Sequence, residues 1–192
     1  MSKLEWKGGT LLAPVPPALV SCGTTEKPNV LTVAWTGILC SDPPKTYVSV
    51  RPSRYSYGLI KESGEFVINV PTVPLARAVD TCGVYSGRDK DKFALCGLTA
   101  EKGFQVSAPV IAESPLSLEC RVTDTVDLGS HTMFLADIVC VDVDEILLDE
   151  SGKFCLDRVK LLAYSHGEYY ELGKRIGTFG WSVKKRHTGK KK

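Results

Sequence analysis

One stretch decides the fold class: residues 132–143, TMFLADIVCVDV. Its Val, Ile and Phe residues favour a strand over a helix, because β-branched and aromatic side chains pack well on a pleated surface. The stretch just before it, Leu116 to Thr123, alternates strictly. Leu118, Cys120 and Val122 occupy one face, and polar residues occupy the other. We therefore predict two long strands in the second half of the chain.

In the rest of the chain, the residue pattern also predicts mostly β-strands. Further strands are expected over residues 17–24, 29–40, 46–50, 65–70, 161–164 and 169–172. Helices are expected over residues 53–63, 74–82 and 89–95, the first capped by Ser53 and ended by Gly64. Six or seven strands in sequence, without βαβ alternation, predict a mainly β, antiparallel barrel or sandwich with short helical insertions.

The charge is divided unevenly along the 192 residues. Lys and Arg number 24 and Asp and Glu number 22, for a net charge of +2. Six of the basic residues lie within residues 184–192, which contain no acid, so residues 1–183 carry 18 basic and 22 acidic residues. We therefore divide the chain into one domain, residues 1–183, and a basic C-terminal tail, residues 184–192.

Cysteine usage bears on the compartment. The seven cysteines are scattered, without a C-x-x-C pair, and most lie in apolar stretches. Free, core-like cysteines favour a reducing cytoplasm. No apolar run is long enough to span a bilayer, so no membrane association is expected. The apolar run from Leu11 to Cys22 has a lipoprotein-like outline, but its three prolines favour a strand.

The motif search excludes several classes of site. There is no G-x-G-x-x-G fingerprint, no P-loop and no G-x-S-x-G elbow. The three histidines are isolated, so no metal site is predicted. We assign no catalytic residue.

The most informative segment is residues 51–56, RPSRYS, which follows a strand and opens a helix. A helix N-terminus presents unpaired backbone N–H groups and a positive dipole end, and so suits a phosphate. Arg51 adds a planar cation, and Ser53 and Ser56 add hydroxyl donors. An ordinary helix start with a solvated arginine is the alternative.

Three other segments carry candidate binding residues. Residues 29–36, NVLTVAWT, end in small residues around Trp35, where a planar ligand can lie against backbone; a core tryptophan is the alternative. The loop at residues 86–93, SGRDKDKF, has basic residues that can close over an anion; an ordinary charged surface loop is the default alternative. His131 stands at the start of the long strand, either as a ligand donor or as a turn residue.

Together, these segments resemble the flavin reductase-like family, whose fold is an FMN-binding Greek-key split β-barrel, and most closely its flavoredoxin branch. The resemblance rests on residues 29–36, on Ser41-Asp42-Pro43-Pro44 and on the run from Val48 to Pro71. Residues 86–93, residues 129–132 (GSHT) and the segment from Tyr170 to Trp181 also fit. It spans roughly residues 10 to 183. The family commonly has a Thr/Ser-rich stretch before the Asp-Pro-Pro; here it is GILCS, residues 37–41.

The resemblance implies a bound FMN, usually at a homodimer interface. The residues it assigns to the phosphate end are Arg51, Ser53, Tyr55, Ser56 and Lys92. Those it places around the flavin are Ala34, Trp35, Thr36, Ser49, Val50, His131 and Tyr164.

Three functions compete. The first is a flavin oxidoreductase that takes electrons from NADH or NADPH; it needs no dinucleotide-binding domain if the nicotinamide stacks on the flavin. The second is an electron carrier that docks to redox proteins, with charge guiding the encounter. The third is nucleic-acid binding by the tail, which is disfavoured because no aromatic residues accompany the cations.

Overall fold

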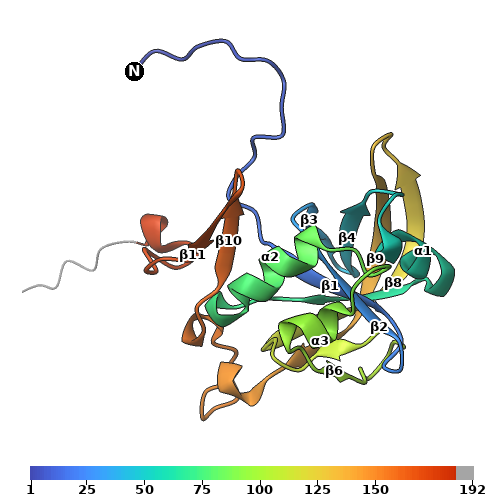
Figure 1. Ribbon diagram of the computed structural model, residues 1–192. Helices are drawn as coiled ribbons and strands as arrows, with labels where there is room; N and C mark the ends of the chain where they lie inside the picture. Colours follow the sequence, from blue (N-terminus) through green and yellow to red (C-terminus); the bar gives the residue numbers. More distant parts are fainter. Residues whose placement is uncertain (185–192) are drawn as a thin grey trace, which may run out of the picture.

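The computed structural model describes residues 1–184, and seven of the strands in this range form one antiparallel sheet (Figure 1). The hydrogen-bonded order is β2-β1-β5-β8-β9-β4-β3. The bounds are β1 Ala18–Gly23, β2 Pro28–Val33, β3 Thr36–Ser41, β4 Pro44–Val50, β5 Glu65–Asn69, β8 Leu116–Asp127 and β9 Thr132–Val143. The prediction of a mainly β, antiparallel fold with few helices is confirmed.

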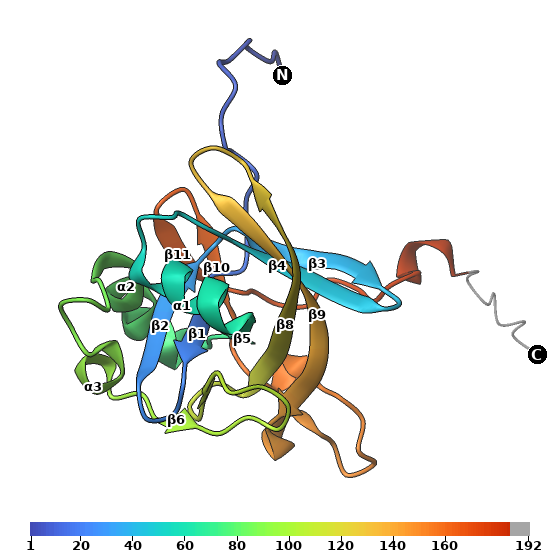
Figure 2. The ribbon, with the colours of Figure 1, turned by 90° about the vertical axis from the view of Figure 1, so that its right-hand side faces the viewer.

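The two long strands of the second half, β8 and β9, pair along their whole length (Figure 2). The observed bounds of β9 equal those predicted from the sequence, whereas β8 continues past the predicted end at Thr123 to Asp127. Along β9, buried Thr132, Phe134 and Ala136 alternate with half-buried residues, as one-sided burial requires. The main strand pattern was therefore readable from hydrophobic alternation.

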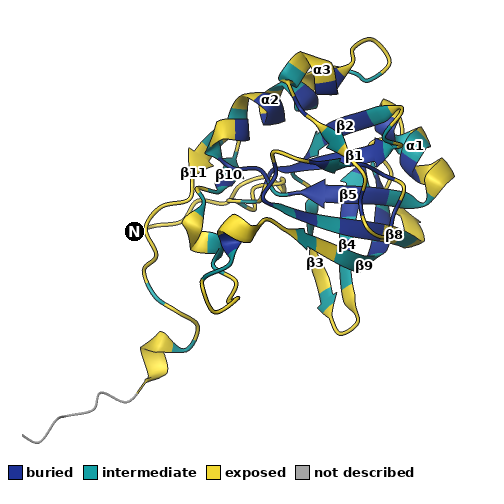
Figure 3. Ribbon diagram, turned by 90° about the horizontal axis from the view of Figure 1, so that it is seen from below, coloured by how far each residue is buried: buried dark blue, intermediate teal, exposed yellow. Residues whose placement is uncertain are grey.

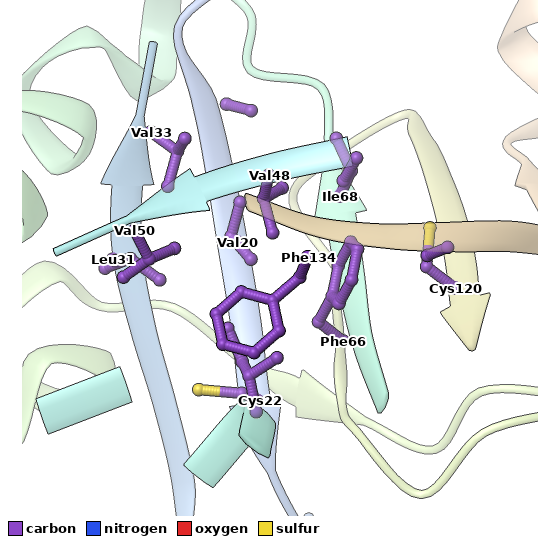
Figure 4. Close-up of a cluster of buried hydrophobic side chains, with 13 residues drawn as sticks. Val20, Cys22, Leu31, Val33, Val48, Val50, Phe66, Ile68, Cys120 and Phe134 are labelled. Carbon is purple, nitrogen blue, oxygen red and sulfur yellow. The ribbon is translucent and has the colours of Figure 1, made fainter. Parts of the chain in front are cut away.

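The sheet curls around an apolar core (Figure 4). Leu31 and Val33 of β2 share this core with Val48 and Val50 of β4, although the two strands stand near opposite ends of the hydrogen-bonded order. Only a rolled sheet brings such strands together. Phe66 and Phe134, both fully buried, are the largest side chains of this core.

Helices cover the β1–β2 end of the sheet. These are α1 Tyr55–Ser63, η1 Val73–Leu75, α2 Ala76–Val84 and α3 Lys92–Cys96. The buried sides of α2 and α3 face β1 and β2 (Figure 3), where Val79 and Phe93 pack on Leu19 and Val30. Both faces of β1 are thus buried, which explains the unbroken burial from Ala18 to Cys22.

The structure corrects three local predictions. The strand expected over residues 29–40 is two strands, because the chain bends at Ala34 and Trp35. The helix expected from residue 53 begins at Tyr55; its N-cap is Arg54, and no side chain caps it, so Ser53 is not the cap. The helix expected over residues 89–95 is shorter, since it starts at Lys92 and is capped by the Asp91 carboxylate. Gly64 ends α1 in the left-handed conformation, as predicted.

Shorter elements complete the described residues. They are β6 Ala100–Glu101, β7 Val110–Ile111, η2 Glu145–Leu147, η3 Leu156–Arg158, β10 Leu162–Ser165, β11 Glu168–Glu171 and η4 Trp181–Val183. Bridges from Val15 to Tyr164 and from Thr72 to Leu161 hold the β10–β11 hairpin against the domain. No helix in residues 1–184 has the length and apolar character of a membrane span. Of the predicted basic tail, residues 185–192 lie outside the described residues.

Two neighbouring carboxylates, one buried and one half-buried, lie away from the helices. Glu119 on β8 is fully buried and accepts hydrogen bonds from the backbone N–H groups of Phe104, Gln105 and Val106. Although burial opposes ionisation, these donors hold the pKa of Glu119 below its usual value. Burial, and then the Glu119 charge, raise the pKa of the neighbouring Asp142 to about 6. The pair therefore couples the stability of the sheet to pH.

Candidate functional site

Two adjoining cavities open where β2 and β4 end, and five residues line both of them. The shared residues are Leu31, Thr32, Arg51, Arg54 and Gly83. The larger cavity, about 350 Å³, is called here the aromatic lobe, and the smaller, about 270 Å³, the basic lobe. Because they share a wall, the two lobes can accept one elongated ligand.

The aromatic lobe is built where β4 pairs with β9. Val50 lies opposite Thr132 in this pairing, so Arg51 and His131 leave the sheet next to each other. Burial, and then the Arg51 charge, lower the pKa of His131, which favours its neutral form at pH 7. Across the lobe, the rings of Tyr164 and Tyr169 lie 5.5 Å apart. Of the predicted residues, the lobe is lined by Ala34, Trp35, Ser49, Val50, Arg51, His131 and Tyr164.

Backbone geometry at the bend between β2 and β3 fits a planar ligand. Trp35 is 37% exposed at this bend, and its carbonyl accepts from the Ser49 N–H at 2.9 Å. The tryptophan is therefore held at the rim of the lobe rather than in the core, which excludes the core-tryptophan alternative. The bend also fixes the neighbouring Ala34 along the wall.

The basic lobe lies between the start of α1 and the α2–α3 connection. Of the predicted residues it is lined by Arg51, Ser53, Tyr55, Ser56 and Lys92. No described carboxylate forms an ion pair with Arg51, Arg54 or Lys92 within residues 1–184. Three cations around one small cavity, none neutralised by the described part of the chain, suit an anion.

Lys92 is a buried cation that lines the basic lobe. It is only 4% exposed, and its Nζ donates to the carbonyls of Cys82 at 3.1 Å and Tyr85 at 3.2 Å. An ammonium has three N–H donors, so one remains for the lobe that Lys92 lines. Burial lowers the pKa of Lys92, because the charge has lost water and gained no anion. Lys92 is therefore a desolvated cation and not the exposed cation of an ordinary charged surface loop.

The wall between the lobe and α1 is packed tightly. A Cβ on Gly87 would lie 2.0 Å from the Asn29 Oδ1 and 2.8 Å from the Tyr55 ring, so only glycine fits. The Asn29 amide in turn donates to Ser56 Oγ at 2.7 Å. This packing places the Ser86–Gly87 turn against the first turn of α1. The lobe is therefore preformed.

One predicted residue lies outside both lobes, and several that line them were not predicted. The hydroxyl of Thr36 donates to the Tyr47 carbonyl at 2.6 Å and lines neither cavity. Arg54, inside the quoted segment, was overlooked although it lines both lobes. Tyr169 and Asp80, whose side chains are 3.4 Å apart, come from distant elements that no local pattern links.

A comparison with models of protein families shows which family the chain belongs to. The model of the flavin reductase like domain matches residues 11–173. The chain belongs to the flavin reductase-like family. This match includes every residue that lines the two lobes.

Solved structures of this family share the fold across the chain. Flavoredoxin of Desulfovibrio vulgaris (Miyazaki F) superposes with a TM-score of 0.87 at 34% identity, covering 95% of this chain and all of that one. The FMN-binding protein from Thermus thermophilus gives a TM-score of 0.77 at 25% identity, covering 93% of this chain and 99% of that one. The expected split-barrel fold is confirmed.

Two relatives add sequence context. A protein of Archaeoglobus fulgidus is 41% identical over 116 residues, which are 60% of this chain and 66% of that protein. The high molecular weight rubredoxin of Moorella thermoacetica is 33% identical over 103 residues. This match covers 52% of the chain but 43% of the larger rubredoxin.

Proposed function

We propose that this protein binds FMN in the two joined lobes and works as a redox flavoprotein. The observation that carries the proposal is Lys92, a buried cation that faces the basic lobe and has no described anionic partner. A phosphate would supply the missing charge. The adjoining aromatic lobe has the apolar, ring-lined walls that a flavin requires.

The donor chemistry fits this ligand at both ends. Lys92, Arg51 and the hydroxyls of Ser53 and Ser56 would hold the phosphate, and Arg54 would add a fourth set of donors. Trp35, Tyr164, Val50 and Ala34 would line the ring, with His131 as a hydrogen-bonding group at its edge. Bound FMN supplies one- and two-electron chemistry; the protein positions the ring and sets its potential.

The nearby cations define what the chain itself contributes. Arg51 lines both lobes, so its positive charge would act on the ring as well as on the phosphate. Positive charge near a flavin favours the reduced, anionic form. His131 Nδ1 lies 2.9 Å from Ser130 Oγ, which fixes the ring orientation and leaves Nε2 free to serve the lobe.

A visible spectrum of the purified protein tests the central proposal. We expect flavin absorption bands, either as isolated or after addition of FMN and removal of the excess. We also expect riboflavin to bind more weakly than FMN, since it lacks the phosphate. A protein that retains no FMN would refute the proposal.

The electron donor separates two modes of action. We propose first that the flavoprotein oxidises NADH or NADPH. The nicotinamide would reach the flavin ring through the open side of the aromatic lobe. The rubredoxin relative favours a second mode, electron transfer to or from a small redox protein. Steady-state reduction of FMN by NADH and NADPH, compared with reduction of bound FMN by reduced rubredoxin, distinguishes them. If neither NADH nor NADPH supports turnover, the enzyme mode is refuted.

We also propose that the protein is a homodimer. Ile38 and Leu39, on edge strand β3, are 67% and 46% exposed. Ile176 and Phe179 after β11 are exposed at 93% and 107%. Apolar side chains of this size on an edge strand and an extended segment favour a partner chain. Light scattering should give twice the 20.9 kDa chain mass, and Ile38→Glu should shift the protein towards monomer; a wild-type monomer refutes this proposal.

A further inference from the structure

Two free thiols, one in α2 and one in α3, lie close together behind the basic lobe. The sulfur of Cys82, in α2, lies 3.8 Å from the sulfur of Cys96, the last residue of α3. No other two cysteine sulfurs in the described residues come within hydrogen-bonding distance. The pair was not visible in the sequence, where the two cysteines stand 14 residues apart.

The two thiols differ in access. Cys82 is 1% exposed, whereas Cys96 is half-buried at the helix end, just before Gly97. Burial, and then the nearby Cys96, raise the pKa of the Cys82 thiol to about 12. A small oxidant therefore reaches Cys96 first, and Cys82 lies where it can resolve the product.

The pair is physically connected to the basic lobe. Cys82 lines the lobe, and its carbonyl accepts a hydrogen bond from Lys92, the first residue of the helix that ends at Cys96. The chain between the two cysteines contains the Ser86–Gly87 turn that closes the lobe. A bond between the sulfurs would fasten both ends of this segment to each other.

We propose that Cys82 and Cys96 form a reversible disulfide that fastens α2 to α3 and so slows the exit of FMN from the basic lobe. The effect on FMN rests on the proposed function; the disulfide itself does not. The sulfurs must approach from 3.8 Å to about 2.05 Å.

A peroxide is the oxidant that fits the half-buried site. The Cys96 thiol gives up its proton as its sulfur attacks one oxygen of hydrogen peroxide; the O–O bond breaks, Cys96 sulfenic acid forms, and the departing hydroxide takes up that proton to form water. Cys82 sulfur then attacks Cys96 sulfur. The S–O bond breaks, and the leaving hydroxide takes the Cys82 proton to form a second water. Two thiols lose two electrons in total and the peroxide gains them; a dithiol such as dithiothreitol reverses the reaction.

The test starts from fully reduced protein treated with a small excess of hydrogen peroxide. Alkylation and peptide mapping should find two fewer free thiols than the seven in the chain and a Cys82–Cys96 cross-linked peptide. Cys96→Ser should form no such peptide. Cys155→Ser, which removes a half-buried thiol elsewhere, should form it as the wild type does. Absence of the cross-link in wild-type protein overturns the inference.

The effect on the cofactor is measured separately on protein loaded with FMN. We expect the oxidised protein to release FMN at least threefold more slowly than the reduced protein, and dithiothreitol to restore the faster rate. Cys96→Ser should release FMN at the reduced rate under both conditions. Equal rates in oxidised and reduced wild-type protein overturn the regulatory role. If the cross-link forms but FMN never binds, the proposed function fails while the disulfide stands.

Discussion

Replacing the buried lysine with methionine tests how the basic lobe selects its ligand. Lys92→Met keeps a four-atom apolar stem, with sulfur in place of one methylene, and removes the terminal ammonium with its charge and donors. Lys92 is 4% exposed, so the proposed contact to phosphate that this variant would lose is a desolvated one. Hydrogen bonds to charged groups contribute about 1.5–3 kcal/mol, which corresponds to roughly 10- to 150-fold in affinity.

The expected result is therefore a selective loss. The Kd for FMN should rise about 10-fold or more, while the Kd for riboflavin, which has no phosphate, should change less than about twofold. Titration followed by flavin fluorescence quenching measures both constants on one preparation. Stability is a poorer readout, because removing the buried charge favours folding whereas the carbonyls of Cys82 and Tyr85 lose a donor.

The matched control is Lys90→Met, which removes an exposed charge two residues away. It should leave both constants within about twofold of wild type, since a solvated cation contributes little. Equal weakening of FMN and riboflavin by Lys92→Met would show that the lysine supports the lobe structurally and does not bind phosphate. An effect of Lys90→Met as large as that of Lys92→Met would attribute the binding to general charge instead.

Three further predictions concern the lobes and the carboxylate pair. Arg51→Ala should weaken FMN retention more than His131→Ala does, because Arg51 lines both lobes and His131 only one; equilibrium dialysis of the two variants compares their Kd values for FMN. Gly87→Ala should lower FMN affinity and the melting temperature together, since its Cβ would lie 2.0 Å from a side-chain oxygen. A raised carboxyl pKa, about 6 for Asp142, gives stability that is complete near pH 4 and is lost as the pH rises towards 6. Asp142→Asn should therefore remove this loss. At pH 7.5 the free energy of unfolding of this variant, measured in urea, should exceed that of wild type by about 1–3 kcal/mol. A wild-type stability that does not change with pH would contradict the coupling.

The sequence predicted those elements whose signal is local. Alternation along β8 and β9 reports one-sided burial directly, so the bounds of β9 were recovered from the pattern alone. Residues 51–56 carried the phosphate signal because strand end, helix start and cation are adjacent in the chain. The single strand predicted over residues 29–40 failed because the bend at Trp35 is imposed by pairing with β4, which residue type does not encode.

The site could be predicted only where its residues share a segment. Arg54 carried a usable signal, since it lies inside the quoted motif and on the rim of both lobes. Tyr169, in the β10–β11 hairpin, and Asp80, in α2, meet although they are 89 residues apart in the chain. The Cys82–Cys96 contact likewise depends on how α2 and α3 pack on β2. Such pairings follow from tertiary packing and leave no trace in spacing.

The basis of anion binding is burial rather than charge number. Residues 1–183 carry four more acidic than basic residues, yet they form a lobe suited to phosphate. Two charges 4 Å apart interact with about 1 kcal/mol in water and about 4 kcal/mol at the effective dielectric of a protein surface. A solvated cation such as the exposed Lys90 should therefore contribute weakly, whereas Lys92, stripped of water and left without a described carboxylate, should contribute strongly. We accordingly expect FMN retention to survive deletion of the basic tail, residues 184–192, and to be weakened by a single change at Lys92.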